Sequence, residues 1–396
     1  MSSPIQVAPD GSLTAPDRLV LPVIIGDGVG PDIWRAAEPV LTEAARLAGK
    51  SLEFVEALAG ARAMAETGSY LPEETLDMLR TRRVGLKGPL ATPVGGGIRS
   101  LNVAIRRALD LYVCVRPVKW TPGVPSPVRR PELMDMVVYR ENTEDVYAGL
   151  EWPAGSPEAE GLIAYAGEKL GARIRPGSAV GLKPMSELCS KRLVRAAVKA
   201  ALRDNRPSVT LVHKGNIMKH TEGGFRRWGY ELAEEEFPGL TVPESGAGPG
   251  ETRLVIKDRI ADNMFMQSLL RPEEYGVLAM PNLNGDYLSD CLAGQIGGLG
   301  MAPGGNIGDG LAVFEATHGT APKYAGQDKV NPSSLILSGA CMFEHLGWAE
   351  AAKKIRGALE AAVADGYVTY DLARQNPALK TVKCSEFGEA VREKLV

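Results

Sequence analysis

Apolar stretches of strand length alternate with amphipathic helical stretches along most of this chain. Residues 19–25 form a run of aliphatic side chains, followed by a glycine turn and then by Pro31, which suits the first position of a helix. In that helix Ile33, Val40 and Leu47 fall on one face. Strands that alternate with helices indicate an α/β fold. The pattern predicts further strands at 51–58, 84–87, 111–118, 134–139 and 209–213, and helices at 73–80, 101–108, 186–203, 222–237, 259–270, 287–296, 333–345, 349–364 and 385–395.

Two segments stand outside this alternation. Residues 1–18 contain three prolines and Gly11 but no apolar run, which predicts a disordered tail rather than a secretory or transit peptide. Residues 152–181 are rich in glycine and proline, with one short amphipathic stretch at 163–170. We expect this second segment to form a small element separate from the core.

Composition limits the class of protein. At about 150 residues per domain, a chain of 396 residues allows two or three domains. Lys and Arg total 45 and Asp and Glu total 48, so a net charge of −3 gives no general attraction to nucleic acid or to an anionic membrane. Five widely spaced cysteines without a Cys-x-x-Cys pair argue against a disulfide framework and against a structural zinc site. No apolar run reaches the roughly 18 residues of a membrane span, so we expect a soluble, cytoplasmic protein.

The glycine turn after the first strand is a candidate nucleotide site. The sequence Gly26-Asp27-Gly28-Val29-Gly30 begins like a dinucleotide-binding fingerprint, but Pro31 occupies its sixth position and no acidic ribose partner follows at the usual distance. A tight turn that needs glycine conformations explains the same residues. Both interpretations remain open from the sequence.

A second glycine-rich loop, residues 88–97, runs into the helix expected at 101–108. Such a loop presents backbone N–H groups and polar side chains to an anion, although Ser100 could also simply cap the helix. Arg106, Arg116 and Arg140 each lie at or near the end of an expected element. Because a guanidinium pairs bidentately with a carboxylate, three converging arginines would suit a ligand with several carboxylates.

Two pairs of aspartates have helical spacing. Asp286 and Asp290 lie four residues apart, and Asp258 and Asp262 repeat the spacing, so each pair would share one face of a helix. Oxygen ligands without a histidine or cysteine cluster indicate a hard cation, Mg²⁺ or Mn²⁺. A solvated acidic face is the alternative.

Five ordered motifs together resemble the isocitrate/isopropylmalate dehydrogenase family. The resemblance runs from about residue 19 to the C-terminus, and it is greatest to the bacterial-type NADP-dependent members that act on isocitrate. The motifs are residues 88–106, Arg140-Glu141-Asn142 with Tyr147-Ala148-Gly149, His213-Lys214-Gly215-Asn216, residues 282–290 and residues 317–324.

The resemblance implies a specific architecture. A large domain would comprise residues 19–111 and 297–396, and a small domain residues 112–144 and 187–296. Residues 145–186 would form a clasp at a homodimer interface. The fold class is then α/β with a mixed sheet, not a Rossmann sheet.

The resemblance also implies roles for individual residues. In a homodimer of this family, the lysine and one aspartate complete the neighbouring subunit's site, so Lys214 and Asp262 would act across the interface. The substrate would be held by Ser100, Asn102, Arg106, Arg116 and Arg140, the metal ion by Asp262, Asp286 and Asp290, and the catalytic side chains would be Tyr147 and Lys214.

The expected cofactor is NADP. Lys323 stands where NAD-dependent members carry an acidic residue that would repel a 2′-phosphate. Ala91 departs from the threonine that close relatives often have beside the nicotinamide. The residues that the resemblance assigns to the cofactor are Thr92, Asn216, His318, Gly319, Thr320, Ala321, Lys323, Tyr324, Asn331, Tyr370 and Arg374.

The implied reaction is oxidative decarboxylation of isocitrate to 2-oxoglutarate and CO₂ with reduction of NADP, in the tricarboxylic acid cycle. One alternative is a sister enzyme that acts on isopropylmalate, homoisocitrate or tartrate; an apolar substituent would need an apolar patch, whereas Ser100 and Asn102 are polar. Another is a silent regulatory subunit, which would be expected to lack Tyr147, Lys214 or an aspartate. Ser100 is in addition a candidate for phosphorylation by a kinase, because phosphate there would repel the substrate.

Overall fold

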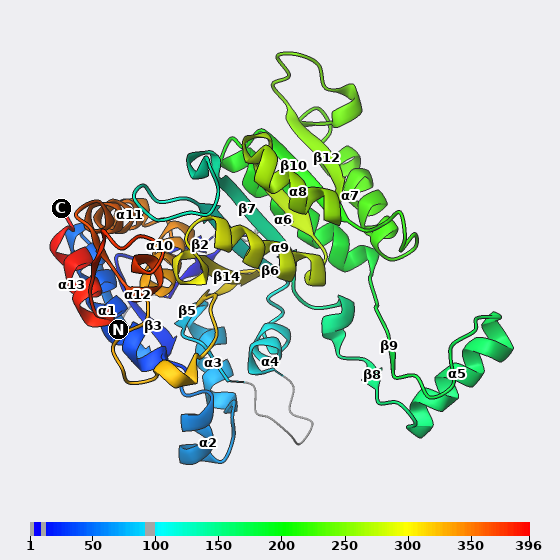
Figure 1. Cartoon of the computed structure of the whole chain (residues 1–396), viewed down its shortest axis with the longest axis horizontal. Coiled ribbons are helices and arrows are strands. Elements are labelled where there is room, and N and C mark those ends of the chain that lie inside the picture. The colour runs from blue at the N-terminus through cyan, green and yellow to red at the C-terminus, as the bar shows by residue number, and fades with distance from the viewer. Residues whose placement is uncertain (1–3, 9–12, 92–99) are drawn as a thin grey trace.

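The computed structural model describes residues 4–8, 13–91 and 100–396 of the chain. Among these residues, eleven strands form one sheet that runs through the whole molecule (Figure 1). They are β3 (Arg18–Ile24), β4 (Ser51–Glu56), β5 (Val84–Lys87), β6 (Val113–Lys119), β7 (Asp135–Glu141), β10 (Ser208–His213), β11 (Thr241–Pro243), β12 (Leu254–Ile260), β13 (Val277–Met280), β14 (Pro303–Gly308) and β15 (Leu311–Ala316). Their order across the sheet is β11-β12-β10-β13-β7-β6-β14-β15-β5-β3-β4.

Two parallel groups of strands are joined by antiparallel pairings. β11, β12, β10, β13 and β7 run parallel at one end, and β15, β5, β3 and β4 run parallel at the other. Between them, β6 pairs antiparallel with β7 and β14, and β14 pairs antiparallel with β15. A Rossmann sheet is mostly parallel and doubly wound. The expectation of an α/β fold with a mixed sheet is therefore confirmed.

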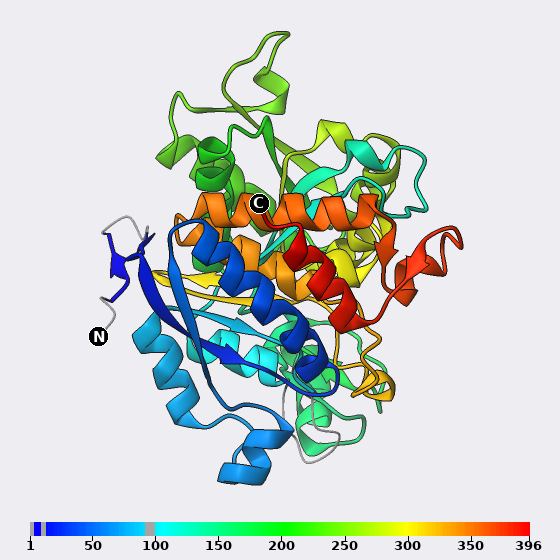
Figure 2. The ribbon, with the colours of Figure 1, turned by 90° about the vertical axis from the view of Figure 1, so that its left-hand side faces the viewer.

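Helices cover both faces of the end formed by β15, β5, β3 and β4. Ala312 and Phe314 belong to one core cluster and Val313 to another, so successive β15 side chains point to opposite faces. The first face packs against α1 (Gly30–Leu47), α10 (Ser333–His345), α11 (Ala349–Ala364) and α13 (Cys384–Glu393), and Figure 2 shows α1, α11 and α13 side by side. The second packs against α3 (Glu73–Arg82) and α4 (Leu101–Ala108), with α2 (Ala61–Thr67) beyond them.

The other end of the sheet is also covered on both faces. Leu211 of β10 lies in one core cluster and Val212 in another, which again follows from the two-residue repeat of a strand. Strands buried on both faces show no polar alternation, and for that reason the apolar run of β13 was not predicted. The covering helices are α6 (Glu187–Arg203) and α7 (Glu222–Glu236) on the first face, and α8 (Ala261–Leu270) and α9 (Asn282–Gln295) on the second.

The segment rich in glycine and proline forms an arm that projects from the rest of the molecule (Figure 1). The short strands β8 (Glu151–Trp152) and β9 (Val180–Gly181) pair antiparallel at its base, and α5 (Pro157–Leu170) lies between them in sequence. The helix begins earlier than expected because the Ser156 hydroxyl accepts a hydrogen bond from the Ala159 N–H at 3.2 Å and Pro157 occupies its first turn. A separate small element was therefore a correct prediction.

The N-terminal tail differs from expectation. Among its described residues, β1 (Gln6–Val7) pairs antiparallel with β2 (Leu13–Thr14), so disorder throughout 1–18 is wrong. Ile5 is buried and Leu13 packs against the same core cluster as α1. This burial of apolar surface offsets the entropy of ordering the segment.

A second correction concerns the helix expected at 259–270. It begins at Ala261, because β12 continues to Ile260 in parallel pairing with β10. Asp258 therefore lies on a strand, where it accepts a hydrogen bond from Tyr230 at 2.8 Å and pairs with Arg226 at 3.1 Å. Asp258 and Asp262 do not share a helical face. Over the described residues, no helix is both long enough and apolar enough to cross a bilayer.

Candidate active site

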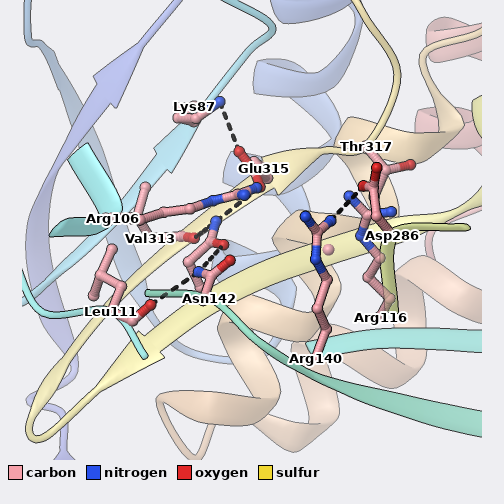
Figure 3. Close-up of polar contacts among 12 residues, drawn as sticks. Lys87, Arg106, Leu111, Arg116, Arg140, Asn142, Asp286, Val313, Glu315 and Thr317 are labelled. Carbon is pink, nitrogen blue, oxygen red and sulfur yellow. Dashed lines mark hydrogen bonds and ion pairs between the residues drawn. The ribbon is translucent and has the colours of Figure 1, made fainter. Parts of the chain in front are cut away.

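Three arginines from three elements form a buried cationic cluster (Figure 3). Arg106 comes from α4, Arg116 from β6 and Arg140 from β7, and each is at least nine-tenths buried. Arg116 faces Val138 in the antiparallel register, two residues from Arg140, so the two arginines lie diagonally on one face. Burial, and then the nearby Arg106, lowers the pKa of Arg140. Cations gathered in this way favour an anionic ligand.

The first turns of α9 bring two of the predicted metal ligands to this cluster. Arg140 donates to Asp286 at 2.5 Å, and Arg116 donates to Asp290 at 2.9 Å. Arg140 also donates to Asn282 Oδ1 at 2.9 Å, which fixes its guanidinium plane. The expected spacing of Asp286 and Asp290 on one helical face is thus present, and these two predicted metal residues lie beside Arg140 and Arg116.

Tyr147 lies beside these groups. It comes from a single 3₁₀ turn, Asp145–Ala148, and its hydroxyl donates to Asp286 Oδ2 at 2.6 Å. The Arg140 guanidinium lies 4.9 Å from the centre of its ring. Burial, and then the hydrogen bond to Asp286, raises the pKa of Tyr147 to about 12. At neutral pH the phenol keeps its proton, as a general acid requires.

Several buried polar atoms of the predicted substrate site have no partner among the described residues. They are Asn102 Oδ1, Arg106 Nε and Arg116 Nε. Ser100 occupies the N-cap position of α4, but its side chain makes no capping hydrogen bond. Unpaired buried donors are costly, and a ligand with several carboxylates would satisfy the two guanidinium groups.

Glu315 is a buried member of the site that the sequence did not reveal. It accepts from Lys87 at 2.7 Å, from Arg106 at 2.8 Å and from Asn306 at 2.8 Å (Figure 3). Burial opposes its ionisation, but Lys87 and Arg106 hold the pKa of Glu315 well below its usual range. Glu315 faces Lys87 directly in the parallel register of β15 and β5. No sequence signal pointed to Glu315, because no strand was predicted at 311–316.

Lys214 and Asp262 form a separate pair. Lys214 follows β10 directly, Asp262 lies in the first turn of α8, and the two side chains are joined by an ion pair. The hydrogen bond from Lys214 lowers the pKa of Asp262. In the described part of the chain, no hydrogen bond or ion pair joins this pair to Tyr147 or Asp286. A single chain therefore brings together two of the three predicted metal ligands, and within residues 4–8, 13–91 and 100–396 no group of three or more His, Cys, Asp or Glu could hold a metal.

The donor set nevertheless fits a hard divalent cation in part. Asp286 and Asp290 supply only oxygen atoms, which Mg²⁺ and Mn²⁺ prefer. Burial raises the pKa of Asp290 although Arg116 opposes this, whereas for Asp286 Arg140 overcomes burial and lowers the pKa. A cation bound between Asp286 and Asp290 would stabilise the ionised form of both carboxylates.

The loop after β15 contains the first group of predicted cofactor residues, His318, Gly319, Thr320 and Ala321. His318 Nδ1 lies 3.0 Å from the Gly319 carbonyl oxygen, and its buried Nε2 has no partner among the described residues. Burial lowers the pKa of His318, so the ring is neutral at pH 7. A neutral ring nitrogen is available for a hydrogen bond to a ligand.

The second group lies around two tyrosines whose rings are in contact and tilted by 44° to each other. The rings of Tyr324 and Tyr370 lie 5.5 Å apart, and Lys323 Nζ lies 4.8 Å from the centre of the Tyr324 ring. Arg374 directly follows the short helix α12 (Tyr370–Ala373), which lies between β16 (Tyr367–Val368) and β17 (Lys380–Thr381). Lys329, which the sequence did not single out, lies 4.9 Å from the Tyr370 ring. These cations and hydroxyls form an exposed site suited to phosphate.

The remaining predicted cofactor residues differ in their surroundings. Asn331 is buried and uses its side chain within the protein: Oδ1 accepts from the Ser333 N–H at 2.9 Å and Nδ2 donates to Asp371 at 3.1 Å. Asn216 is exposed in the loop that carries Lys214, remote in sequence from the tyrosines. Thr92 lies outside the described residues.

The glycine turn after β3 is hydrogen-bonded to two loops, one after β5 and one after β15. The Asp27 N–H donates to the Pro89 carbonyl at 2.7 Å, and the Val29 N–H donates to the Thr320 carbonyl at 3.0 Å. A Cβ on Gly28, whose φ is +60°, would lie 2.1 Å from the Thr320 oxygen. Close backbone approach therefore explains the glycines, and the tight-turn interpretation accounts for this motif.

Comparisons with known proteins agree with this geometry. The chain matches the model of the family described as isocitrate/isopropylmalate dehydrogenase over residues 20–391. It is 54% identical over 392 residues to a protein of Archaeoglobus fulgidus named isocitrate dehydrogenase [NADP], covering 98% of this chain and 95% of that relative. A relative of the same name from Haloferax volcanii is 52% identical over 395 residues, with 97% and 94% covered.

A solved structure shows the same architecture. The crystal structure of isocitrate dehydrogenase from Methylococcus capsulatus matches with a TM-score of 0.80 at 37% identity, covering 95% of this chain and 99% of that chain. The chain therefore belongs to the isocitrate/isopropylmalate dehydrogenase family.

Proposed function

We propose that this chain oxidatively decarboxylates isocitrate to 2-oxoglutarate and CO₂ while reducing NADP, as in the tricarboxylic acid cycle. The observation that carries the proposal is the buried cluster of Arg106, Arg116 and Arg140 beside Asp286 and Asp290. Isocitrate has three carboxylates, and a guanidinium pairs with a carboxylate through two parallel hydrogen bonds. Relatives named isocitrate dehydrogenase [NADP], more than half identical over nearly the whole chain, support the same substrate and cofactor.

In this proposal the described side chains bind and orient the substrate. The unpaired Nε–H groups of Arg106 and Arg116 donate to its carboxylates, and Ser100 and Asn102 supply neutral polar contacts. Glu315 keeps Arg106 in place, because the pair is buried and its geometry is supported by Lys87. Isopropylmalate has an apolar isopropyl group in place of the third carboxylate arm, and this group would leave the polar contacts of Ser100 and Asn102 without a partner.

Two side chains move protons. Lys214 assists removal of the proton from the substrate hydroxyl, and Tyr147 donates its phenolic proton to the carbon that loses CO₂. When bound, Mg²⁺ or Mn²⁺ supplies charge stabilisation at the substrate oxygens, and NADP supplies the hydride acceptor. Asp286 and Asp290 are the residues of the same chain that would hold the cation.

We further propose a homodimer with shared sites. Lys214 and Asp262 pair with each other, and no hydrogen bond or ion pair among the described residues joins them to Tyr147 or Asp286, which supports a role for them in the site of a second copy. Met266, Leu269 and Leu270 of α8 are exposed apolar side chains, which a subunit interface would cover. In this dimer the arm of residues 145–186 would act as the clasp, and the division into large and small domains would follow the predicted ranges.

NADP is favoured over NAD by the charges around Tyr324 and Tyr370. Positive charge comes from Lys323, Lys329 and Arg374. Position 323 is a lysine in this chain, whereas NAD-dependent members of the family carry an acidic residue there. Two charge-assisted contacts at about 1.5–3 kcal/mol each correspond to a preference of roughly two to four orders of magnitude in catalytic efficiency.

We also propose a cytoplasmic location, and phosphorylation of Ser100 by a kinase as a block to substrate binding.

Turnover of the purified enzyme tests the proposal. Reduced cofactor is followed by absorbance with Mn²⁺ or Mg²⁺, using isocitrate and isopropylmalate, each with NADP and with NAD. We expect turnover with isocitrate and NADP, and much weaker turnover of the other combinations. If isopropylmalate is turned over and isocitrate is not, the chain has the sister activity. No turnover of either substrate would favour a regulatory subunit.

A further inference from the structure

Two buried carboxylates lie behind the proposed catalytic side chains. Asp145 opens the 3₁₀ turn that carries Tyr147, and Glu222 opens α7, just beyond the loop that carries Lys214. Each carboxylate is only 1% exposed. Charges buried to this degree destabilise a fold unless they are paired and hydrogen-bonded.

One ammonium group pairs with both carboxylates. Lys183, which follows β9 at the base of the arm, forms an ion pair with Asp145 Oδ1 and lies 3.0 Å from Glu222 Oε1. Its side chain is 17% exposed. Lys183 thus joins the turn that carries Tyr147 to the start of α7.

The other oxygen of each carboxylate holds backbone and side-chain donors of the site. Glu222 Oε2 accepts from the Lys214 N–H at 2.5 Å and from Asn284 Nδ2 at 2.8 Å. Asp145 Oδ2 accepts from the Leu283 N–H at 3.0 Å. Leu283 and Asn284 belong to the first turn of α9, the helix that carries Asp286. One lysine therefore connects three segments that position the chemistry.

The turn at Asp145 needs this support. Asp145 has a φ of +69°, in the left-handed region that non-glycine residues rarely adopt. A strained conformation persists only where surrounding contacts hold it. Here the contacts are Lys183, the Leu283 N–H, and the Asp145 N–H, which donates to the Pro184 carbonyl at 3.0 Å.

We propose that Lys183 is a positioning residue that orients both Tyr147 and Lys214 through Asp145 and Glu222. This inference rests on the proposed function, in which Tyr147 acts in the site of its own chain and Lys214 in that of the partner. Lys183 of one chain then supports both active sites of the dimer. It touches neither substrate nor cofactor.

Steady-state kinetics of three variants test this role, with Lys183→Met compared with Lys183→Arg. Lys191→Met is the matched control, because Lys191 is also 17% exposed and pairs with Glu187 and two further carboxylates, on α6 and α7 away from the site. We expect Lys183→Met to lower kcat at least tenfold with KM for isocitrate within threefold. Lys183→Arg should regain at least a third of the parent kcat, and Lys191→Met should stay within twofold.

Two results would overturn the proposal: a folded Lys183→Met enzyme with kcat within threefold of the parent, or an equal loss in Lys191→Met. If Lys183→Met does not fold, Glu222→Gln tests the role of Lys183 instead. This variant keeps an oxygen acceptor for the Lys214 N–H but loses the ion pair between Lys183 and Glu222. Its kcat should fall at least fivefold with KM unchanged, and an unchanged kcat would reject the role of Lys183. If Lys183→Met folds, combining it with Glu222→Gln should cost less than the product of the two single losses.

Heterodimers test the claim that one lysine serves two sites. A differently tagged parent chain is paired with a Lys183→Met chain, and the purified heterodimer is assayed against the parent dimer. If both sites are perturbed, we expect about one-third of the parent activity or less. A heterodimer with half or more of the parent activity would show that only one of the two catalytic side chains depends on Lys183. All results are ratios to the parent, whereas the proposed function itself stands or falls on turnover of the parent alone.

Discussion

Single side chains in this site are held mainly by charged partners. Arg140 is 1% exposed and pairs with Asp286, whose second oxygen accepts from Tyr147. Removing one member of a buried ion pair leaves the other uncompensated, at a cost of about 3–5 kcal/mol. Substitutions that delete a charge here will therefore lower stability together with activity. Variants that remove a single neutral group are more informative about the chemistry.

Replacing Tyr147 with Phe removes only the phenolic hydroxyl. We expect kcat for isocitrate to fall at least tenfold, the low end for loss of a general acid, with KM within threefold. Tyr112→Phe is a matched control, because the Tyr112 hydroxyl also donates to a carboxylate, Asp309, at 2.8 Å. Steady-state assays of both variants check the prediction. An equal loss in both would assign the effect to the lost hydrogen bond and not to proton transfer.

His345 predicts how stability depends on pH. Its side chain is partly buried, its inaccessible Nε2 has no partner among the described residues, and burial lowers the pKa of His345 from 6.5 to about 4. Between these values the unfolded chain binds a proton that the folded chain does not, so stability falls as the pH drops from 6.5 to 4. The full loss is about 3 kcal/mol.

His345→Leu should remove this contribution. Urea unfolding at pH 7.5, 5.5 and 4.5 should show a smaller decrease in the free energy of unfolding than in the parent. His220→Leu, at an exposed histidine, is the control and should follow the parent curve. Parallel curves for His345→Leu and the parent would contradict the prediction.

At the scale of elements, strand register delivers the charged residues in pairs. Lys87 and Glu315 face each other across β5 and β15, and Arg116 and Arg140 are diagonal neighbours across β6 and β7. The loop after β5 and the loop after β15 are both hydrogen-bonded to the glycine turn of residues 26–30. Side chains on neighbouring strands are separated by fixed distances, so the site inherits its precision from the sheet.

Gly28→Ala tests the glycine turn. Its Cβ would meet the Thr320 oxygen at 2.1 Å, so we expect the cofactor loop to shift and KM for NADP to rise at least fivefold, with KM for isocitrate within twofold. Gly49→Ala is the matched control, because Gly49 has a φ of +73° and nothing within 4 Å of the added Cβ. Both variants pay the conformational cost of about 1 kcal/mol for a positive φ, but only the first displaces the loop. Equal KM values for NADP in the two variants would refute the displacement.

At the scale of the whole molecule, the proposed homodimer, in which Lys214 acts in the site of the partner, predicts that an isolated chain is inactive. Lys214→Met and Tyr147→Phe should each give dimers with at least tenfold lower turnover. Mixing the two after subunit exchange should restore about one quarter of parent activity, because half of the dimers are hybrids and each hybrid has one intact site. Activity is measured with exchange confirmed by differently tagged chains. No recovery despite exchange would reject the shared site.

The sequence by itself determined the elements with a strong local signal. The expected helices at 101–108, 333–345 and 349–364 match α4, α10 and α11 residue for residue, because apolar positions repeat with the helical period. The motifs also named residues that the structure brings together: Arg116, Arg140, Tyr147 and the Asp286–Asp290 pair are in contact, while their chemical roles stay predictions. The helical periodicity and the motifs are local patterns of sequence, so they can be interpreted without knowledge of the fold.

Only the tertiary structure decided which distant segments meet. Glu315 reaches Arg106 across 209 residues of sequence, and Lys183, at the base of the arm, lies 3.0 Å from Glu222 at the start of α7. The strands β14 and β15 have no local alternation, since β14 contains three glycines and β15 is buried on both faces. The tail at Ile5 is ordered only because a core surface lies beside it. Long-range pairing depends on surfaces that exist after the chain has folded, and no local pattern contains that information.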